Sequence, residues 1–109
     1  MSQKEVLAVQ NANFKNWRKL PIDRHVLELC GEAGEVANAT KKYMRTLEGW
    51  KIGIITKEEL IEKLKEELAD IRICLDLIAN YYDLDLVELV RSKLEVNIKK
   101  FGWKDPRDI

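Results

Sequence analysis

Two acidic pairs in the chain have the residue types and the spacing of a metal site. Glu32 and Glu35 are three residues apart in LCGEAGEVANATKK, and Glu67 and Asp70 are three apart in KEELADIRICLDLIANYY. Residues three apart lie on one side of an α-helix, so each pair presents two carboxylates together. Carboxylates from two packed helices repel one another unless a cation neutralises them. Mg²⁺, with Mn²⁺ as an alternative, is the expected cation because it prefers oxygen ligands and also binds substrate phosphates. This pattern predicts hydrolysis of a phosphoanhydride.

The second acidic pair continues an apolar stripe of its helix. At about 100° per residue, the stripe runs back from its apolar members to the acids and a lysine: Tyr81, Leu77, Cys74, Asp70, Glu67 and Lys63. Burying an unpaired charge is costly, so acids on this line favour a bound cation. The alternative is ordinary surface charge, with Lys63 paired to Glu67 four residues on. Arg72 and Asp76 fall on the opposite side and are expected to face solvent.

The composition favours one helical domain. The chain has 109 residues, which fits a single domain over 1–109. Hydrophobic residues make up 46% and charged residues 35%, with five Gly and two Pro, which suits long helices better than a turn-rich sheet. Lys and Arg number 19, as do Asp and Glu, so the basic excess of a nucleic-acid-binding protein is missing.

Hydropathy and cysteine usage indicate a cytoplasmic protein. No apolar run approaches the length of a membrane span, and no apolar segment follows a basic start as in a secretory signal. We therefore expect no membrane partner. Cys30 and Cys74 lack CxxC spacing and fall at apolar helical positions, so both are expected to be reduced core residues.

Capping patterns divide the chain into four helices and no strand. The expected helices cover about residues 3–19, 22–47, 56–82 and 85–102. Capping pairs begin the first, third and fourth helices: Ser2 with Glu5, Thr56 with Glu59, and Asp85 with Glu88. Pro21 follows the first helix, and Gly102 closes the last one. The third helix is apolar around about half its circumference, more than one short chain can cover. The expected fold is therefore an all-α, four-helix single domain that assembles into an oligomeric helical bundle.

The acidic segments also resemble a known family. HVLELCGEAGEVANATKK and KEELADIRICLDLIANYYDLDLVELVRSKLEVNIKKFG are similar to the MazG-type all-α nucleoside triphosphate pyrophosphohydrolases, relatives of the dimeric dUTPases and dCTPases. The resemblance covers residues 22–104. It implies Mg²⁺ coordination by Glu32, Glu35, Glu67 and Asp70, and cleavage of a nucleoside triphosphate to the monophosphate and pyrophosphate. It also implies a homo-oligomer, a dimer or tetramer, that serves in nucleotide-pool housecleaning.

One segment departs from the family pattern. Thirty-one residues separate Glu35 from Glu67, toward the long end of the family's range, and the extra length lies around LEGWKIGIITKEE. A loop extension of this kind affects the substrate contacts more than the metal site.

The expected phosphate-binding residues lie in the last helix and just after it. Lys93, Asn97 and Lys100 recur at spacings of four and three and so share one face, and Lys104 follows Gly102. The alternative is a solvated basic face at a helix C-terminus, which suits the helix dipole. The resemblance favours a phosphate-binding role because the family places a similar set of side chains there.

The expected base-binding residues lie elsewhere in the chain. Gln10, Asn13 and Trp17 share one side of the first helix, and Trp50 lies in the loop between the acidic helices. Amides can read a base edge while an aromatic ring stacks on its face. Plain packing is the alternative for both tryptophans. For His25, the single histidine, a core or capping role is expected.

In the expected mechanism, water attacks the α-phosphorus while Mg²⁺ offsets charge on the phosphate oxygens. Analogy with the family assigns Glu32 as the general base and also as a metal ligand. A di-iron carboxylate bundle requires Glu-x-x-His pairs, and Ile22 stands three residues before His25 where such a pair would need Glu. The remaining alternative is a non-catalytic helical oligomerisation or interaction module.

Overall fold

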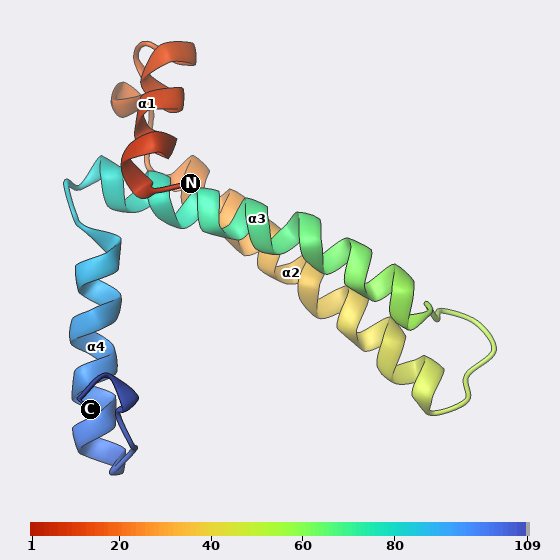
Figure 1. Ribbon diagram of the computed structural model, residues 1–109. Coiled ribbons are helices and arrows are strands. Elements are labelled where there is room, and N and C mark those ends of the chain that lie inside the picture. The colour runs from red at the N-terminus through yellow and green to blue at the C-terminus, as the bar shows by residue number, and fades with distance from the viewer. Residues whose placement is uncertain (109) are drawn as a thin grey trace.

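Two helices of equal length, α2 (Asp23–Leu47) and α3 (Lys57–Tyr81), pack side by side as an antiparallel hairpin (Figure 1). The computed structural model describes residues 1–108. At the end of the hairpin opposite its loop, α1 (Gln3–Asn13) packs against α3, and α4 (Leu86–Phe101) leaves in another direction. Short 3-10 turns occupy Trp17–Lys19 and Pro106–Asp108. Within the described residues the fold is all-helical, as predicted.

The capping residues begin the helices where the sequence predicts. The hydroxyls of Ser2 and Thr56 accept backbone N–H bonds from the glutamates three residues on, which reciprocate. Asp85 accepts from the backbone N–H groups of Val87 and Glu88, and Gly102 closes α4 at a φ of 66°. These ends are confirmed because a cap depends on residues within one turn.

The predicted first helix over residues 3–19 is too long. α1 ends at Asn13, and the chain turns before Trp17–Lys19. The turn folds Trp17 back beneath α1, where its ring is 3% exposed and its indole N–H donates to Asn11 Oδ1 at 2.8 Å. Burial of this large aromatic ring accounts for the interruption, since a continuous helix could not place it there.

The sequence prediction for Asp76 is also wrong. Asp76 is 1% exposed, because α1 lies over the side of α3 that the sequence pattern assigns to solvent. Arg72, which is exposed as expected, has its Nε 3.6 Å from Asp76 Oδ2 and donates from Nη2 to the carbonyl oxygen of Met1. The first residues of the chain therefore cover a charged pair on α3.

The loop after α2 is ordered by contacts with the last turn of that helix. Trp50 donates its backbone N–H to the carbonyl of Arg45, whose guanidinium lies 4.8 Å from the centre of the Trp50 ring. Thr46 Oγ1 bonds both the N–H and the carbonyl of Ile55. These bonds close the distal end of the hairpin.

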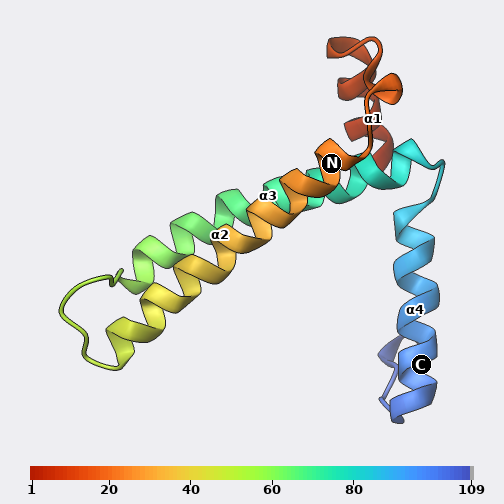
Figure 2. The same cartoon turned by 180° about the vertical axis from the view of Figure 1, so that it is seen from behind.

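Many apolar side chains remain exposed in the single chain. α4 contacts the end of α3 and, at its first turn, Gln3 of α1, and the two opposite views agree that it runs away from the hairpin (Figure 2). Val87, Val90 and Phe101 on α4 are each more than half exposed. Cys30 is exposed rather than in the core as predicted, whereas Cys74 is buried as predicted. None of the helices in residues 1–108 combines the length and the apolar character needed to cross a membrane.

Candidate functional site

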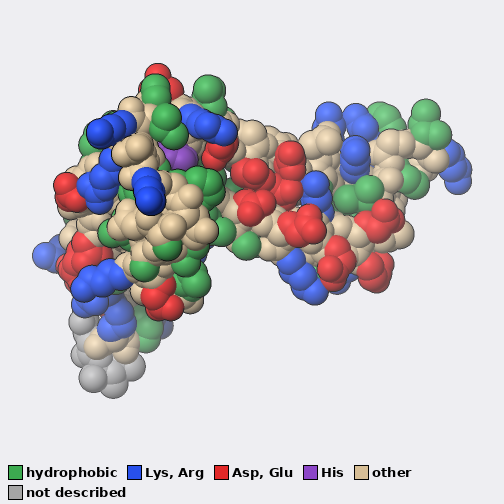
Figure 3. Space-filling model, turned by 90° about the horizontal axis from the view of Figure 1, so that it is seen from above, with side chains coloured by type: hydrophobic (Ala, Val, Ile, Leu, Met, Phe, Trp, Pro, Cys, Tyr) green, Lys and Arg blue, Asp and Glu red, His purple; other side chains and the backbone are tan. Residues whose placement is uncertain are grey.

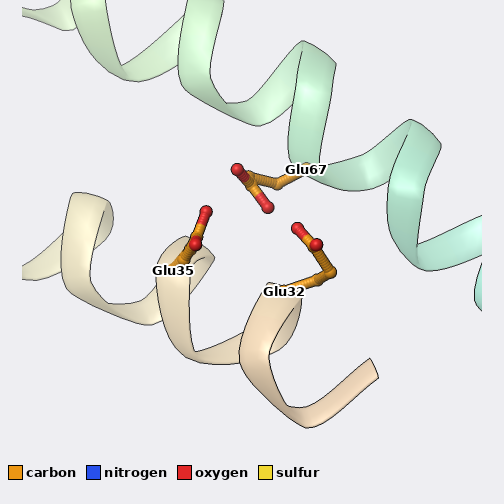
Figure 4. Close-up of side chains that lie close together, drawn as sticks. All are labelled: Glu32, Glu35 and Glu67. Atoms are coloured by element: carbon orange, nitrogen blue, oxygen red, sulfur yellow. The ribbon is translucent and has the colours of Figure 1, made fainter. Parts of the chain in front are cut away.

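The hairpin brings together three of the four predicted metal-binding acids. Glu32 and Glu35 project from α2 toward Glu67 on α3 (Figure 4). One carboxylate oxygen from each residue lies within 4.8 Å of one oxygen from each of the others. We call Glu32, Glu35 and Glu67 the acidic cluster. In the space-filling view, acidic side chains gather along one face of the hairpin (Figure 3).

Glu67 is the buried member of the acidic cluster. Its side chain is 5% exposed, whereas Glu32 is half-buried and Glu35 is exposed. Glu67 Oε2 is buried and has no hydrogen-bond partner within the described residues. A buried carboxylate oxygen without a donor is costly, so this atom is suited to a metal ion or another positive ligand.

A lysine pairs with two of the cluster's carboxylates. Lys63 Nζ lies 3.3 Å from Glu67 Oε1 and 3.4 Å from Glu35 Oε2. Hydrogen bonds to Glu67 and then to Glu35 raise the pKa of the Lys63 ammonium above its usual value. The pairing of Lys63 with Glu67 that the sequence suggested as ordinary surface charge is therefore present, and it extends across the hairpin to α2.

Asp70, the fourth predicted metal ligand, lies outside the cluster and is exposed. It is nevertheless on the same side of α3. Burial raises the pKa of the Cys74 thiol, and the nearby charges of Glu28, Glu32 and Asp70 raise it further. Two further acidic side chains, Asp70 on α3 and Glu28 on α2, therefore lie beyond the acidic cluster on the side toward α1. Glu28 is one turn of α2 before Glu32.

A cavity of about 230 Å³ adjoins Glu28, one turn before Glu32 on α2. Two predicted base-binding residues, Gln10 and Trp17, line it together with Phe14, Arg24 and His25. The ring of Trp17 meets the His25 and Tyr81 rings edge-on, with centroids 6.3 Å away in both cases. His25 Nδ1 is buried, has no hydrogen-bond partner among residues 1–108 and lies 3.8 Å from Glu28 Oε2.

A second hollow, of about 430 Å³, lies on the loop side of the acidic cluster. Glu35 of the acidic cluster and its partner Lys63 line this hollow. Asn38, Lys42 and Glu59 complete the polar lining of the hollow. The acidic cluster therefore separates a cavity near α1, lined in part by aromatic rings, from a hollow that contains two lysines.

The remaining predicted site residues lie away from the acidic cluster. Asn13 is exposed and donates its amide to the Val9 carbonyl of its own helix. Trp50 is in the loop at the distal end of the hairpin. Lys93, Asn97 and Lys100 are on α4, which turns away from the hairpin, and Lys104 follows it. Lys93 and Asn97 do share one shallow hollow of about 340 Å³ on α4, as their spacing predicts.

Several residues of this region were not predicted from the sequence. Arg24 has no distinctive spacing, whereas Glu28 and Lys42 can be found by extending the Glu32 and Glu35 register of α2 in both directions. The sequence predicts a core or capping role for His25, which lines the cavity. Comparison of the chain with protein-family models, curated protein sequences and solved structures finds no significant match.

Proposed function

We propose that the protein binds Mg²⁺ at the acidic cluster and hydrolyses a nucleoside triphosphate to the monophosphate and pyrophosphate. The observation that carries the proposal is the geometry of Glu67. Its Oε2 atom is buried and lacks a hydrogen-bond partner within the described residues, and one oxygen of its carboxylate lies within 4.8 Å of one oxygen each of Glu32 and Glu35 on the facing helix. Three carboxylates at this separation form an oxygen-rich donor set of the type that Mg²⁺ prefers, and Mn²⁺ suits the same ligands. The resemblance to MazG-type pyrophosphohydrolases agrees with this chemistry.

The cavity beside α1 is suited to the base of the nucleotide. Its aromatic members, Trp17 and Phe14, offer apolar ring surface, while the Gln10 amide can form hydrogen bonds with a base edge. A base in this cavity would leave the phosphates over the acidic cluster, because Glu28 and Glu32 are adjacent turns of one helix face.

Each carboxylate has a distinct role in the proposed reaction. When bound, Mg²⁺ offsets the negative charge of the phosphates and acidifies a water molecule. Glu35 and Glu67 would hold the ion, and Asp70, exposed on the same side of α3, would be the further ligand. Glu32 is half-buried and accepts the proton of the water that attacks the α-phosphorus.

A second copy of the chain is part of the proposal. Lys93, Asn97 and Lys100 cannot reach the acidic cluster of their own chain, because α4 points away from it. The apolar residues of α4 are exposed in the single chain, so pairing of two copies would bury them. A homodimer or homotetramer would then supply phosphate-binding side chains from one copy to the cluster of another.

Product analysis tests the proposed function. The purified protein is incubated with each common NTP and dNTP plus Mg²⁺, and the products are separated over time. A productive substrate should yield its monophosphate and pyrophosphate in equal amounts, and EDTA should stop the reaction. Glu67→Gln is the inactive control. Early accumulation of a diphosphate would contradict attack at the α-phosphorus.

The second candidate is a non-catalytic helical interaction module. The exposed apolar face of α4 favours it, since such a face is typical of helices that associate with a partner. This candidate predicts self-association without any Mg²⁺-dependent release of pyrophosphate. The same product analysis therefore distinguishes the two functions.

A further inference from the structure

The ammonium of Lys63 lies between Glu35 and Glu67, where a metal ion bound by these carboxylates would place its positive charge. The lysine is on α3, one turn before Glu67, and its ammonium bridges to Glu35 on α2. Within the described residues, no other lysine or arginine forms an ion pair with the acidic cluster. Lys63 is therefore the positive charge that offsets the repulsion between these carboxylates.

The contacts of Lys63 are weak enough for its ammonium to move away from Glu35 and Glu67. Its distances of 3.3 and 3.4 Å to the two carboxylates exceed the 2.7–2.9 Å or so of a strong charge-assisted hydrogen bond. Its side chain is 43% exposed, so the ammonium can return to water without opening a cavity. Glu67, by contrast, is held in place by its burial. A change of counter-ion would thus move the lysine and leave the carboxylate in position.

We propose that Lys63 and the divalent cation occupy the acidic cluster in turn. Without metal, the ammonium neutralises Glu35 and Glu67. A divalent cation takes over these carboxylates and repels the ammonium, which moves into the hollow beside Asn38 and Lys42 and binds the outer phosphates of the substrate there. This inference rests on the proposed function and adds a phosphate-binding residue from the same chain.

The order of residues along α2 supports this direction for the phosphate chain. Positions 28, 32, 35, 38 and 42 recur at spacings of three and four, so they follow one face of the helix. The aromatic cavity lies beside Glu28, the acidic cluster is at Glu32 and Glu35, and the hollow with the lysines is at Asn38 and Lys42. A base bound near Glu28 would therefore direct the terminal phosphates toward Lys42 and Lys63.

The experiment compares Lys63→Met with Lys65→Met. Both substitutions remove one positive charge and keep an unbranched apolar stem, but Lys65 pairs with the exposed Glu62 at 2.9 Å. Mn²⁺ binding is measured by titration with detection of free Mn²⁺ by electron paramagnetic resonance. Binding of inorganic tripolyphosphate is then measured by calorimetry on each protein at saturating Mg²⁺.

Lys63→Met should bind Mn²⁺ about tenfold more tightly than the wild type and tripolyphosphate about tenfold more weakly, while Lys65→Met matches the wild type in both. A merely structural role for Lys63 would weaken both kinds of binding. If the wild type binds Mn²⁺ and Lys63→Met binds it no more tightly, the exchange is wrong and the proposed metal site stands. If neither protein binds Mn²⁺, the proposed function itself is wrong. Tighter Mn²⁺ binding with unchanged tripolyphosphate binding supports the exchange and overturns the phosphate contact.

Discussion

The side chain of Gln3 donates a hydrogen bond of 2.7 Å to Oδ1 of Asn80, and the Asn80 amide donates in return to the Gln3 carbonyl at 3.3 Å. Gln3 also donates to the carbonyl of Leu84 and accepts from the backbone N–H of Leu86. One residue of α1 thus joins the end of α3 to the start of α4. Since Asn80 is 6% exposed, its two bonds with Gln3 are partly shielded from water.

Gln3→Ala should lower the free energy of unfolding by about 1–3 kcal/mol, because the polar groups of Asn80 lose their partners. We also expect a higher KM for nucleotide, since Gln3 anchors the helix that carries Gln10. Urea denaturation and steady-state kinetics measure the two effects. Lys4→Ala, a change at an exposed neighbour, is the control. Equal stability of the two variants would contradict the role assigned to Gln3.

Arg72→Met should destabilise the protein by about 1–3 kcal/mol, because it leaves the buried Asp76 carboxylate without its cation and removes the bond to Met1. The same substitution should cost less in an Asp76→Asn background, where no buried charge remains. A double-mutant cycle by urea denaturation gives the coupling energy. Arg91→Met is the matched control, since Arg91 pairs with an exposed Glu88 and should cost under about 0.5 kcal/mol. Additive losses would show that Asp76 does not depend on Arg72.

Glu35→Gln, Glu67→Gln and Asp70→Asn should each reduce kcat/KM at least about hundredfold, because each removes a charge that holds the metal. The helical content should stay at the wild-type level, as judged by circular dichroism. Glu67→Gln should not lower the melting temperature, because it removes a buried charge that has one unpartnered oxygen. Glu66→Gln, at an exposed position next in sequence, should keep full activity. Full activity of Glu67→Gln would refute the site.

Leu94→Glu should dissociate the proposed oligomer and reduce turnover. Leu94 is 41% exposed and lies beside Lys93 and Asn97 in the hollow on α4, so a charge there opposes burial against a second copy. Light scattering at micromolar concentration measures the mass, and the same samples are assayed. Ser92→Glu introduces the same charge at another exposed position of α4 and serves as the comparison. A wild-type protein that is strictly monomeric would rule out the proposed assembly.

Cys74 should react far more slowly with iodoacetamide at pH 8 than Cys30 does. Burial and the neighbouring acids raise the pKa of the Cys74 thiol, so the reactive thiolate is scarce, whereas Cys30 is exposed. The folded state favours the neutral Cys74 thiol more than the unfolded state does. The neutral thiol therefore contributes fully to the free energy of unfolding below about pH 9, and this contribution is lost as the pH rises through the raised pKa of the folded state. Mass spectrometry of timed samples gives the rates. Equal rates for Cys74 in native and urea-unfolded protein would contradict the burial.

Features that depend on neighbouring residues in the chain could be predicted from the sequence. Ser2, Thr56 and Asp85 cap their helices as expected, because an N-cap bonds to backbone groups two or three residues on. The i, i+3 spacing also predicts that Glu32 and Glu35 lie on one side of α2. Their approach to Glu67 follows only once α2 and α3, which are consecutive in the chain, pack side by side as a hairpin.

Only the tertiary structure decided which faces are covered. Asp76 lies opposite the apolar stripe of α3, so the sequence pattern predicts that it faces solvent. α1 packs over it instead and leaves it 1% exposed. The periodicity of a helix identifies its apolar side but carries no information about a segment more than sixty residues away in the sequence. The direction of α4 is likewise decided by contacts at its first turn, including the Gln3 bond to Leu86. That direction places Lys93 and Asn97 far from the carboxylates of their own chain, because local spacing fixes which residues share a face but not where the helix points.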